Sequence, residues 1–393
     1  MIKTMINFED AYKIVKNSVK TIGTERIPFM NSVNRILAED VKSDIEMPPF
    51  DKSAVDGFAC RAEDLDMPLE IIEVVQAGQT PAEKVTKGQC TKIMTGAPIP
   101  YGADTVVMVE YTDTENNTVR VQRKQSKTNI SYRAEDVTEG QKVLQKGILI
   151  KSQHIAVFAS VGYTQVLVSK QVNVGIISTG DELIEPENKP GMSKIRNSNG
   201  YQIRAQVEAM GAKSAYYGIA KDTYDDTFEK VTKALSENDV IMLSGGVSVG
   251  EFDFVPKVLK KAGITILFDS VAVTPGKPTT FGKSENKFCF GLPGNPVSSF
   301  VQFELLAKPF LFGMMGYNFK APEIKLPAAE DFLRNRTQRK AFIPVHIVKG
   351  EVKRVEYHGS AHIHALSSAD GLISFPVGVD TIKKGELADV RQI

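Results

Sequence analysis

The sequence predicts a multidomain protein of α/β and β domains: a central doubly wound α/β domain, a β-rich insert domain, a small helical linker domain and a C-terminal β-barrel. Three observations favour this fold class. Strand-like and helix-like segments alternate through residues 171–315, as in a doubly wound, mainly parallel sheet. Residues 46–141 hold short strand-like runs separated by Pro and Gly, and residues 316–393 alternate as strands do.

The helical domain is assembled from two separate stretches of the chain. Asn7 is suited to cap the first helix, with Asp10 three residues further on. A second helix-like run begins at about Ser152. We therefore expect residues 1–45 and 142–170 to form one small domain on either side of the β-rich insert.

Composition removes several classes of function from consideration. The 48 basic and 47 acidic residues give a net charge of +1, which offers no support for nucleic acid or an anionic membrane as partner. Cys60, Cys90 and Cys289 are far apart in the chain and suggest no disulfide framework, as expected of a reducing cytoplasm. The N-terminus lacks a signal-like apolar core, and no apolar run has the length of a membrane span. We expect a cytoplasmic protein.

Four Gly-rich turns follow strand-like segments of the α/β domain: "IISTGDEL" (176–183), "LSGGVSVGEFD" (243–253), "VTPGKPTTFG" (273–282) and "GLPGNPVSSF" (291–300). Such turns, where they lead into helices, present backbone N–H groups to phosphate. Each one alone is equally well an ordinary loop. Four in one sheet favour a binding site beyond the carboxyl ends of the strands. The GxGxxG and GxxxxGK[ST] signatures are absent, so neither a dinucleotide fold nor a P-loop NTPase is supported.

Acidic side chains gather in the same part of the chain. They are Asp181, Glu182, Asp222, Glu251 and Asp253. Asp181 and Asp222 are also suited to cap a helix. Carboxylates beside a phosphate are unfavourable unless a cation lies between them, and Mg²⁺ binds one or two carboxylates together with phosphate oxygens and water. The pattern therefore predicts Mg²⁺-assisted chemistry at a phosphoanhydride.

The β-rich domain and the C-terminal domain each contain one further feature. "MPPFDKSAVDGFA" (47–59) and "IMTGAPIPYGADTVV" (93–107) suggest ordered loops, although rigid turns between strands explain them equally well. His358, His362 and His364 lie in a strand-like region. We expect them to face solvent and not to bind metal.

Seven motifs, in chain order, resemble the molybdopterin molybdenumtransferase family, the MoeA group that includes the E domain of gephyrin. They are "MPPFDKSAVDGFA", "IMTGAPIPYGADTVVMVE", "ISTGDEL", "IRNSNGYQI", "LSGGVSVGEFDF", "TPGKPTTFG" and "GLPGNPVSS". The resemblance covers essentially the whole chain. It implies a homodimer of elongated four-domain chains, with the helical domain in dimerisation. It also implies a reaction in which adenylylated molybdopterin and molybdate give molybdenum cofactor, AMP and water, with Mg²⁺.

The resemblance carries over to individual residues by motif. It implies catalytic roles for Asp56, Glu182, Asp222 and Asp253, of which the last three would also bind Mg²⁺. The implied cleft lies between the α/β domain of one subunit and the β-rich domain of the other. The residues expected to bind substrate are Thr95, Asp136, Thr179, Gly180, Asp181, Asn199, Ser244, Gly245, Gly246, Ser248, Gly250, Pro275, Gly276, Lys277, Pro293, Gly294, Asn295, Pro296 and Arg339.

One departure from the family pattern leaves alternatives open. Family members often carry basic residues where this chain has Thr274 and Ser270. Either Lys277, Lys283 or Arg339 compensates, or the chain is a weaker or specialised paralogue. The alternatives are molybdopterin adenylylation, a non-catalytic cofactor-binding scaffold, and insertion of tungstate instead of molybdate. Molybdopterin adenylyltransferase and the apoproteins of molybdenum enzymes are further expected partners.

Overall fold

The computed structural model describes residues 5–123, 125–246 and 255–393. The chain divides into two compact units. The first comprises Met1–Ala38, Gly147–Lys151 and Val166–Ile393, and the second comprises Glu39–Lys146 and Ser152–Gln165. Within the described ranges, no helix is both long enough and apolar enough to cross a membrane.

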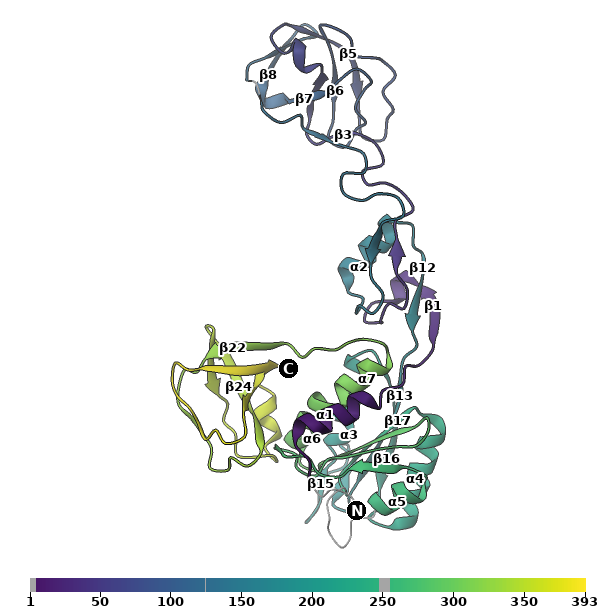
Figure 1. Ribbon diagram of the computed structural model, residues 1–393, viewed down its shortest axis with the longest axis vertical. Helices are drawn as coiled ribbons and strands as arrows, with labels where there is room; N and C mark the ends of the chain where they lie inside the picture. Colours follow the sequence, from purple (N-terminus) through teal and green to yellow (C-terminus); the bar gives the residue numbers. More distant parts are fainter. Residues whose placement is uncertain (1–4, 124, 247–254) are drawn as a thin grey trace. The chain divides into compact units, whose positions relative to one another are not determined.

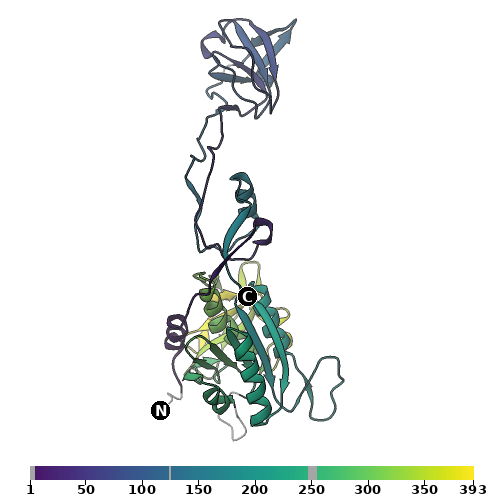
Figure 2. The same ribbon diagram turned by 90° about the vertical axis from the view of Figure 1, so that its right-hand side faces the viewer.

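A six-stranded sheet forms the centre of the first unit (Figure 1, and turned by 90° in Figure 2). Four neighbouring strands are parallel, the next strand is antiparallel to them, and the edge strand beyond it runs in the direction of the four again. In sheet order they are β16 (Lys213–Ala220), β13 (Asn173–Thr179), β17 (Val240–Ser244), β21 (Phe288–Leu292), β20 (Thr280–Lys283) and β18 (Thr265–Phe268). The predicted doubly wound, mainly parallel sheet is confirmed.

Helices cover both faces of this sheet, because the sheet strands bury alternate side chains on opposite sides. In β17, Val240 and Met242 join one apolar core, whereas Ile241 and Leu243 join the other. The first core is completed by α1 (Phe8–Asn17), α3 (Asn199–Ala209), α6 (Pro296–Gln302) and α7 (Lys308–Met314). The second is completed by α4 (Tyr224–Glu237) and α5 (Val255–Lys261). Figure 1 shows α1, α3 and α6 on one side of the sheet and α4 and α5 on the other.

These helices have two local features. The N-cap of α1 is the predicted one, since the Asn7 side-chain oxygen accepts a hydrogen bond of 2.7 Å from the Asp10 N–H. Between α6 and α7 the helix widens into a π-helical turn at Phe303–Ala307. Two short pairs complete the α/β part: β1 (Thr24–Pro28) with β12 (Gln165–Ser169), and β14 (Leu183–Ile184) with β15 (Ile195–Arg196).

The C-terminal domain is a sheet that closes on itself. Its strands are β22 (Glu323–Pro327), β24 (Lys340–Val348), β25 (Glu351–Arg354), β26 (Gly371–Phe375) and β28 (Leu387–Gln392), with β23 (Phe332–Leu333) and β27 (Thr381–Ile382) forming a small ribbon. Ala328, just after β22, bridges Val352 of β25 and joins the two ends of the sheet. The predicted β-barrel is confirmed. β19 (Val273–Thr274) pairs in parallel with β24 and ties the barrel to the α/β domain.

The second unit holds a separate six-stranded sheet with its own apolar core. In order its strands are β7 (Thr105–Met108), β4 (Gly57–Cys60), β6 (Gln89–Ile93), β5 (Leu69–Val75), β9 (Thr118–Val121) and β8 (Thr112–Glu115). The same unit contains α2 (Ser152–Ser160) and the pairs β3 (Lys52–Ser53) with β10 (Ile130–Ser131) and β2 (Val41–Lys42) with β11 (Lys142–Leu144). A β-rich domain was predicted for this region.

Candidate active site

Three of the four Gly-rich turns meet at one edge of the central sheet. Ser178 of β13 is in register with Ser244 of β17, and Ser244 is in register with Leu292 of β21. The three parallel strands therefore end side by side, so that the turns after them share the carboxyl-terminal edge. This is the edge at which doubly wound sheets bind their ligands.

Asn199 links two of these turns. It is the first residue of α3, and its side chain is 8% exposed. Its Nδ2 donates to Ser244 Oγ and to the Gly294 carbonyl, each at 2.8 Å. One buried amide thus fixes the end of β17 and the turn after β21 relative to each other.

The glycines of these turns allow close backbone packing. Gly245 has φ +91°, and a Cβ there would lie 2.5 Å from the Thr179 carbonyl oxygen. The Gly245 N–H donates to the Leu292 carbonyl (3.1 Å), and the Gly180 N–H donates to the Ala220 carbonyl (3.3 Å). Both amides therefore bond within the protein, although phosphate was the partner we expected for them. Gly246 follows with φ +60°.

The acidic residues of the site lie where β13 and β16 end. The Asp181 N–H donates to Asp222 Oδ2 and the Asp222 N–H donates to Asp181 Oδ1, each at 3.1 Å. A Cβ on Gly180 would lie 2.5 Å from Glu182 Oε2, so the Glu182 carboxylate folds back over this turn. Lys194 Nζ donates to the Asp181 carbonyl. Asp181 and Asp222 are thus direct neighbours, Glu182 lies on the same turn as Asp181, and all three residues are exposed.

Part of the predicted site falls outside the structure. Ser248, Gly250, Glu251 and Asp253 lie outside the described residues. Within the described part of the chain, no group of three or more His, Cys, Asp or Glu side chains is arranged to hold a metal ion.

The PGKP turn adjoins the same edge, because Thr280 at the start of β20 is in register with Gly291 near the end of β21. The turn is held from beneath: Gln302 Nε2 donates to the Pro275 carbonyl (3.2 Å). Gly276 has φ +109° and leaves room for the Gln302 side chain, which would lie 2.6 Å from a Cβ at this position.

The three candidate cations lie at different places in the structure. Lys277 of the PGKP turn is exposed. Arg339 is half-buried and donates through Nη1 to the Val273 carbonyl (3.4 Å), beside Thr274. Lys283 is in register with Phe288, the first residue of β21. It therefore lies at the opposite edge of the sheet, and the suggestion that it compensates at this site is wrong.

The backbones of Ser270 and Thr274 pair with other segments of the first unit. Ser270 is 8% exposed, and its carbonyl accepts a hydrogen bond of 3.1 Å from the Ile6 N–H. Thr274 is in register with Ala341 of β24. Both positions belong to the segment that joins the α/β domain to its neighbours in the first unit.

Asp56, Thr95 and Asp136 lie in the second unit. Asp56 Oδ1 accepts hydrogen bonds from both the N–H and the hydroxyl of Thr95, each at 2.7 Å. The Thr95 N–H, followed by its hydroxyl, holds the pKa of Asp56 below its ordinary value of 3.8. Asp136 is exposed, and its N–H donates to the Met47 carbonyl (2.9 Å).

The two Pro- and Gly-rich segments of this unit are bonded to each other. The Gly96 N–H donates to the Ser53 carbonyl (2.8 Å), and the Ser53 N–H donates to the Ala97 carbonyl (2.9 Å). Residues 47–59 and 93–107 are therefore ordered partners, and their contact brings Asp56 to Thr95.

Two features of the site were missed by sequence reasoning. The C-terminal barrel reaches the turn after β21, since Asn295 Nδ2 donates to Ser360 Oγ (2.9 Å) and the Val297 N–H donates to the Ser360 carbonyl (3.0 Å). Ser360 lies in the run "HGSAHIH", which we considered only as a candidate metal site because of its histidines. His358 and His364 are exposed, as expected, but His362 is half-buried, and the strand predicted for this region is instead a short 3-10 helix at Ile363–Leu366. The second feature is a network of hydrogen-bonded side chains around Tyr216, which bonds to Asn197 and Glu185.

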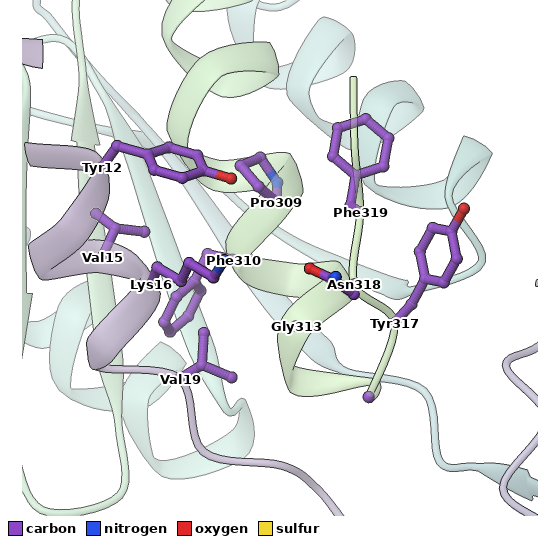
Figure 3. A pocket seen from close by; sticks show the side chains of 11 residues that line it. Tyr12, Val15, Lys16, Val19, Pro309, Phe310, Gly313, Tyr317, Asn318 and Phe319 are labelled. Carbon is purple, nitrogen blue, oxygen red and sulfur yellow. The ribbon is translucent and has the colours of Figure 1, made fainter. Parts of the chain in front are cut away.

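An apolar groove lies away from this site (Figure 3). It has a volume of about 260 Å³ and is lined by Tyr12 and Val15 of α1 and by Phe310 of α7, among others. Helix α6 starts at the carboxyl-terminal edge, just after β21, and continues through the π-helical turn into α7. The groove at α7 therefore lies away from that edge and is not part of the candidate active site.

Comparison with known proteins places the chain in one family. Family models match in chain order: "MoeA N-terminal region (domain I and II)" over residues 6–162, "Probable molybdopterin binding domain" over 175–313, and "MoeA C-terminal region (domain IV)" over 325–393. A molybdopterin molybdenumtransferase of Staphylococcus epidermidis is 37% identical, covering 99% of this chain and 96% of the relative. One of Staphylococcus aureus is 35% identical over 98% and 95%.

Solved structures agree with these matches. A crystal structure of the molybdopterin biosynthesis MoeA protein from Pyrococcus horikoshii has a TM-score of 0.87 and 30% identity, and covers 99% of this chain and 100% of that chain. The fold and its carboxyl-edge site therefore define a protein of the molybdopterin-binding class. Within that class, the chain belongs to the MoeA family, the molybdopterin molybdenumtransferases.

Proposed function

We propose that this protein is a transferase that inserts molybdate into adenylylated molybdopterin and releases AMP. The observation that carries the proposal is the meeting of the turns after β13, β17 and β21, with Asn199 bonded to two of them. Full-length similarity to relatives named for this activity supports it.

The site residues suit a substrate with a pterin at one end and a phosphoanhydride beyond it. Asn199 and the backbone of the turn at Gly294 would contact the pterin and its phosphate. Lys277, exposed on the adjoining turn, is the cation placed to neutralise the phosphate or the oxyanion. Arg339 is half-buried beside that turn and would supply a second positive charge.

We also propose a magnesium requirement, with Glu182, Asp222 and Asp253 as the residues that hold the ion. The described residues fit this group, because the exposed carboxylates of Glu182 and Asp222 lie on the turns after β13 and β16 at the carboxyl edge. Mg²⁺ takes one or two protein carboxylates and completes its shell with phosphate oxygens and water, so a cage of protein ligands is not required. When bound, the ion would neutralise charge that develops on the phosphoanhydride.

The working form that we propose is a homodimer. Asp56 and Thr95 belong to the second unit of the chain, whereas the Gly-rich turns belong to the first. We propose that Asp56 of the partner subunit completes each site. Its carboxylate, whose pKa the Thr95 hydrogen bonds lower further, is ionised at neutral pH and would act as a hydrogen-bond acceptor in the site.

Location and further partners complete the proposal. Cys60, Cys90 and Cys289 are all buried and unpaired, which supports a cytoplasmic protein. The substrate would come from a molybdopterin adenylyltransferase, and the product would pass to apoproteins of molybdenum enzymes.

The test is release of AMP from adenylylated molybdopterin on adding molybdate, with and without Mg²⁺, and in parallel with tungstate. We expect release that requires Mg²⁺ and an oxyanion. An Asp222→Ala variant should lose it, since it removes a carboxylate at the reacting end. Tight binding without AMP release would contradict the proposal and favour a scaffold. AMP-transfer from ATP to molybdopterin would favour an adenylyltransferase.

A further inference from the structure

A network of hydrogen-bonded side chains joins the start of α3 to the end of β13. Ser178 Oγ donates to Asn197 Oδ1 (3.0 Å), and Asn197 Nδ2 donates to the Tyr216 hydroxyl (2.6 Å). Tyr216 donates to Glu185 Oε1 (2.8 Å), and the Tyr201 hydroxyl donates to Glu185 Oε2 (3.0 Å). We call these five residues the Glu185 network. None of them is among the residues to which a role in the reaction was assigned above.

The network holds the first turn of α3 directly against the sheet. Asn197 Oδ1 also accepts from the Gly200 N–H (3.1 Å). A Cβ at Gly200 would lie 2.7 Å from Ser178 Oγ and 3.0 Å from Tyr216 Cε2, so no side chain fits between the helix and β13. Asn199, the residue before Gly200, is thereby placed where its amide joins β17 to the turn after β21.

Two members of the network are sheltered from water, whereas Tyr201 at its outer end is 39% exposed. Ser178 is 0% exposed and Asn197 is 1% exposed, so their hydrogen bonds are costly to lose. Burial, and then the hydrogen bond to Glu185, raise the pKa of Tyr216. Its hydroxyl therefore stays protonated at neutral pH and remains a donor to Glu185.

We propose that Glu185, Tyr216 and Asn197 are positioning residues for the transferase reaction. They fix the start of α3 and the turn after β13, and through these they fix Asn199 where it binds the substrate. They act through Asn199 and do not touch the substrate themselves. The proposal rests on the function proposed above and adds residues to it.

The next residue along β16 supplies a matched control. Tyr217 faces the other side of the sheet, where its hydroxyl donates to Glu237 Oε2 (2.6 Å) and accepts from Asn238 Nδ2 (2.7 Å). This Asn–Tyr–Glu arrangement has the same chemistry as the Glu185 network. It joins β16 to the end of α4 and has no contact with Asn199.

The experiment compares Tyr216→Phe with Tyr217→Phe. Each removes one hydroxyl with two hydrogen bonds and keeps the ring. Dissociation constants for adenylylated molybdopterin would be measured by calorimetry, alongside KM, kcat and the melting temperature. Losing two hydrogen bonds in a positioning network should raise Kd and KM about tenfold in Tyr216→Phe. We expect kcat to change less than KM, and Tyr217→Phe to match the wild type in both Kd and KM despite a similar loss of melting temperature.

A second pair of variants keeps the test decisive if Tyr216→Phe folds poorly. Glu185→Gln retains an acceptor for Tyr216 and should restore most of the affinity that Glu185→Ala loses. Equal affinity in wild type, Tyr216→Phe and Glu185→Ala would overturn the positioning role and leave the proposed function standing. So would equal weakening by the two Tyr→Phe variants, since that reports general loss of stability. A wild-type chain that binds no adenylylated molybdopterin would overturn both.

Discussion

The pKa of Asp56 is lowered by a single neighbour. Both hydrogen bonds to its Oδ1 come from Thr95, and these bonds lower its pKa. A carboxylate with a lowered pKa stabilises the fold at pH values above its unfolded pKa, and this contribution is lost as the pH falls through the folded pKa. Asp56 is therefore ionised throughout the neutral and mildly acidic range.

Thr95→Val tests this dependence, because it removes the hydroxyl and keeps both the backbone N–H and the shape of the side chain. We expect the pKa of Asp56 to rise towards 3.8, since one of the two lowering hydrogen bonds remains. The carboxyl carbon of Asp56, followed by NMR through a titration, reports the value. An unchanged pKa would show that the Thr95 hydroxyl has no part in holding the charge.

Gly245 shows what a left-handed turn requires when it is also crowded. Gly245→Ala would place a Cβ at φ +91° and 2.5 Å from the Thr179 carbonyl oxygen. Gly263 is a matched control: it has φ +83°, and a Cβ there would meet nothing within 4 Å. Both variants carry the strain of a positive φ, about 1–3 kcal/mol, but only Gly245→Ala adds a collision with backbone. Urea denaturation should show the larger loss for Gly245→Ala, and equal losses would contradict the crowded geometry.

At the scale of the element, the order of strands and helices along the chain was enough to predict that the turns after these strands share one edge of the sheet. Alternating strands and helices predict a parallel sheet, and the parallel strands β13, β17 and β21 do end at one edge. Side-chain partners could not be predicted in the same way. Asn199 was recognised from its motif, but its bonds to Ser244 and Gly294 depend on register between segments far apart in sequence.

The sequence could not show either which backbone amides of the turns bond within the protein and which face a ligand. A Gly-rich turn predicts N–H groups that face a ligand. In the structure the Gly245 N–H instead extends the ladder between β17 and β21 by bonding to Leu292. The choice depends on how far each strand continues past its apolar run, which the residue types alone do not define. Likewise, the contact of Ser360 with Asn295 required knowledge of how the barrel closes.

Asn199→Ala tests the role of the side chain that begins α3. It leaves Ser244 and the Gly294 carbonyl without their buried partner, which should cost about 1–3 kcal/mol of stability. Asn238→Ala is a matched control, because Asn238 is 4% exposed and its Nδ2 also makes two bonds, to Tyr217 and to the Ala234 carbonyl.

Both Asn variants should therefore lose similar stability in urea, but only Asn199→Ala should bind adenylylated molybdopterin more weakly. Calorimetric titration at a temperature where both variants are folded separates the two effects. Equal substrate affinity in the two variants would mean that Asn199 serves the fold alone.

At the scale of the whole molecule, the two compact units divide the predicted chemistry between them. The Gly-rich turns and the acids at their edge belong to the first unit, and Asp56 with Thr95 belongs to the second. Sequence patterns distinguished the α/β, β-barrel and β-rich parts of the chain from their own periodicity, since a core is a local property of a domain. The pairing of units within a dimer depends on surfaces that have no comparable periodic signature.

Mixing two inactive variants tests whether each site is shared between subunits. Asp56→Ala and Asp222→Ala each remove one proposed catalytic carboxylate, from the second and the first unit respectively. In a mixed dimer with a shared site, Asp222 of one chain and Asp56 of the other remain together in one of the two sites. Random exchange of equal amounts should therefore restore about a quarter of wild-type AMP release. If each chain instead forms its own complete site, every site in the mixture lacks one of the two carboxylates. The mixture then stays as inactive as either variant alone.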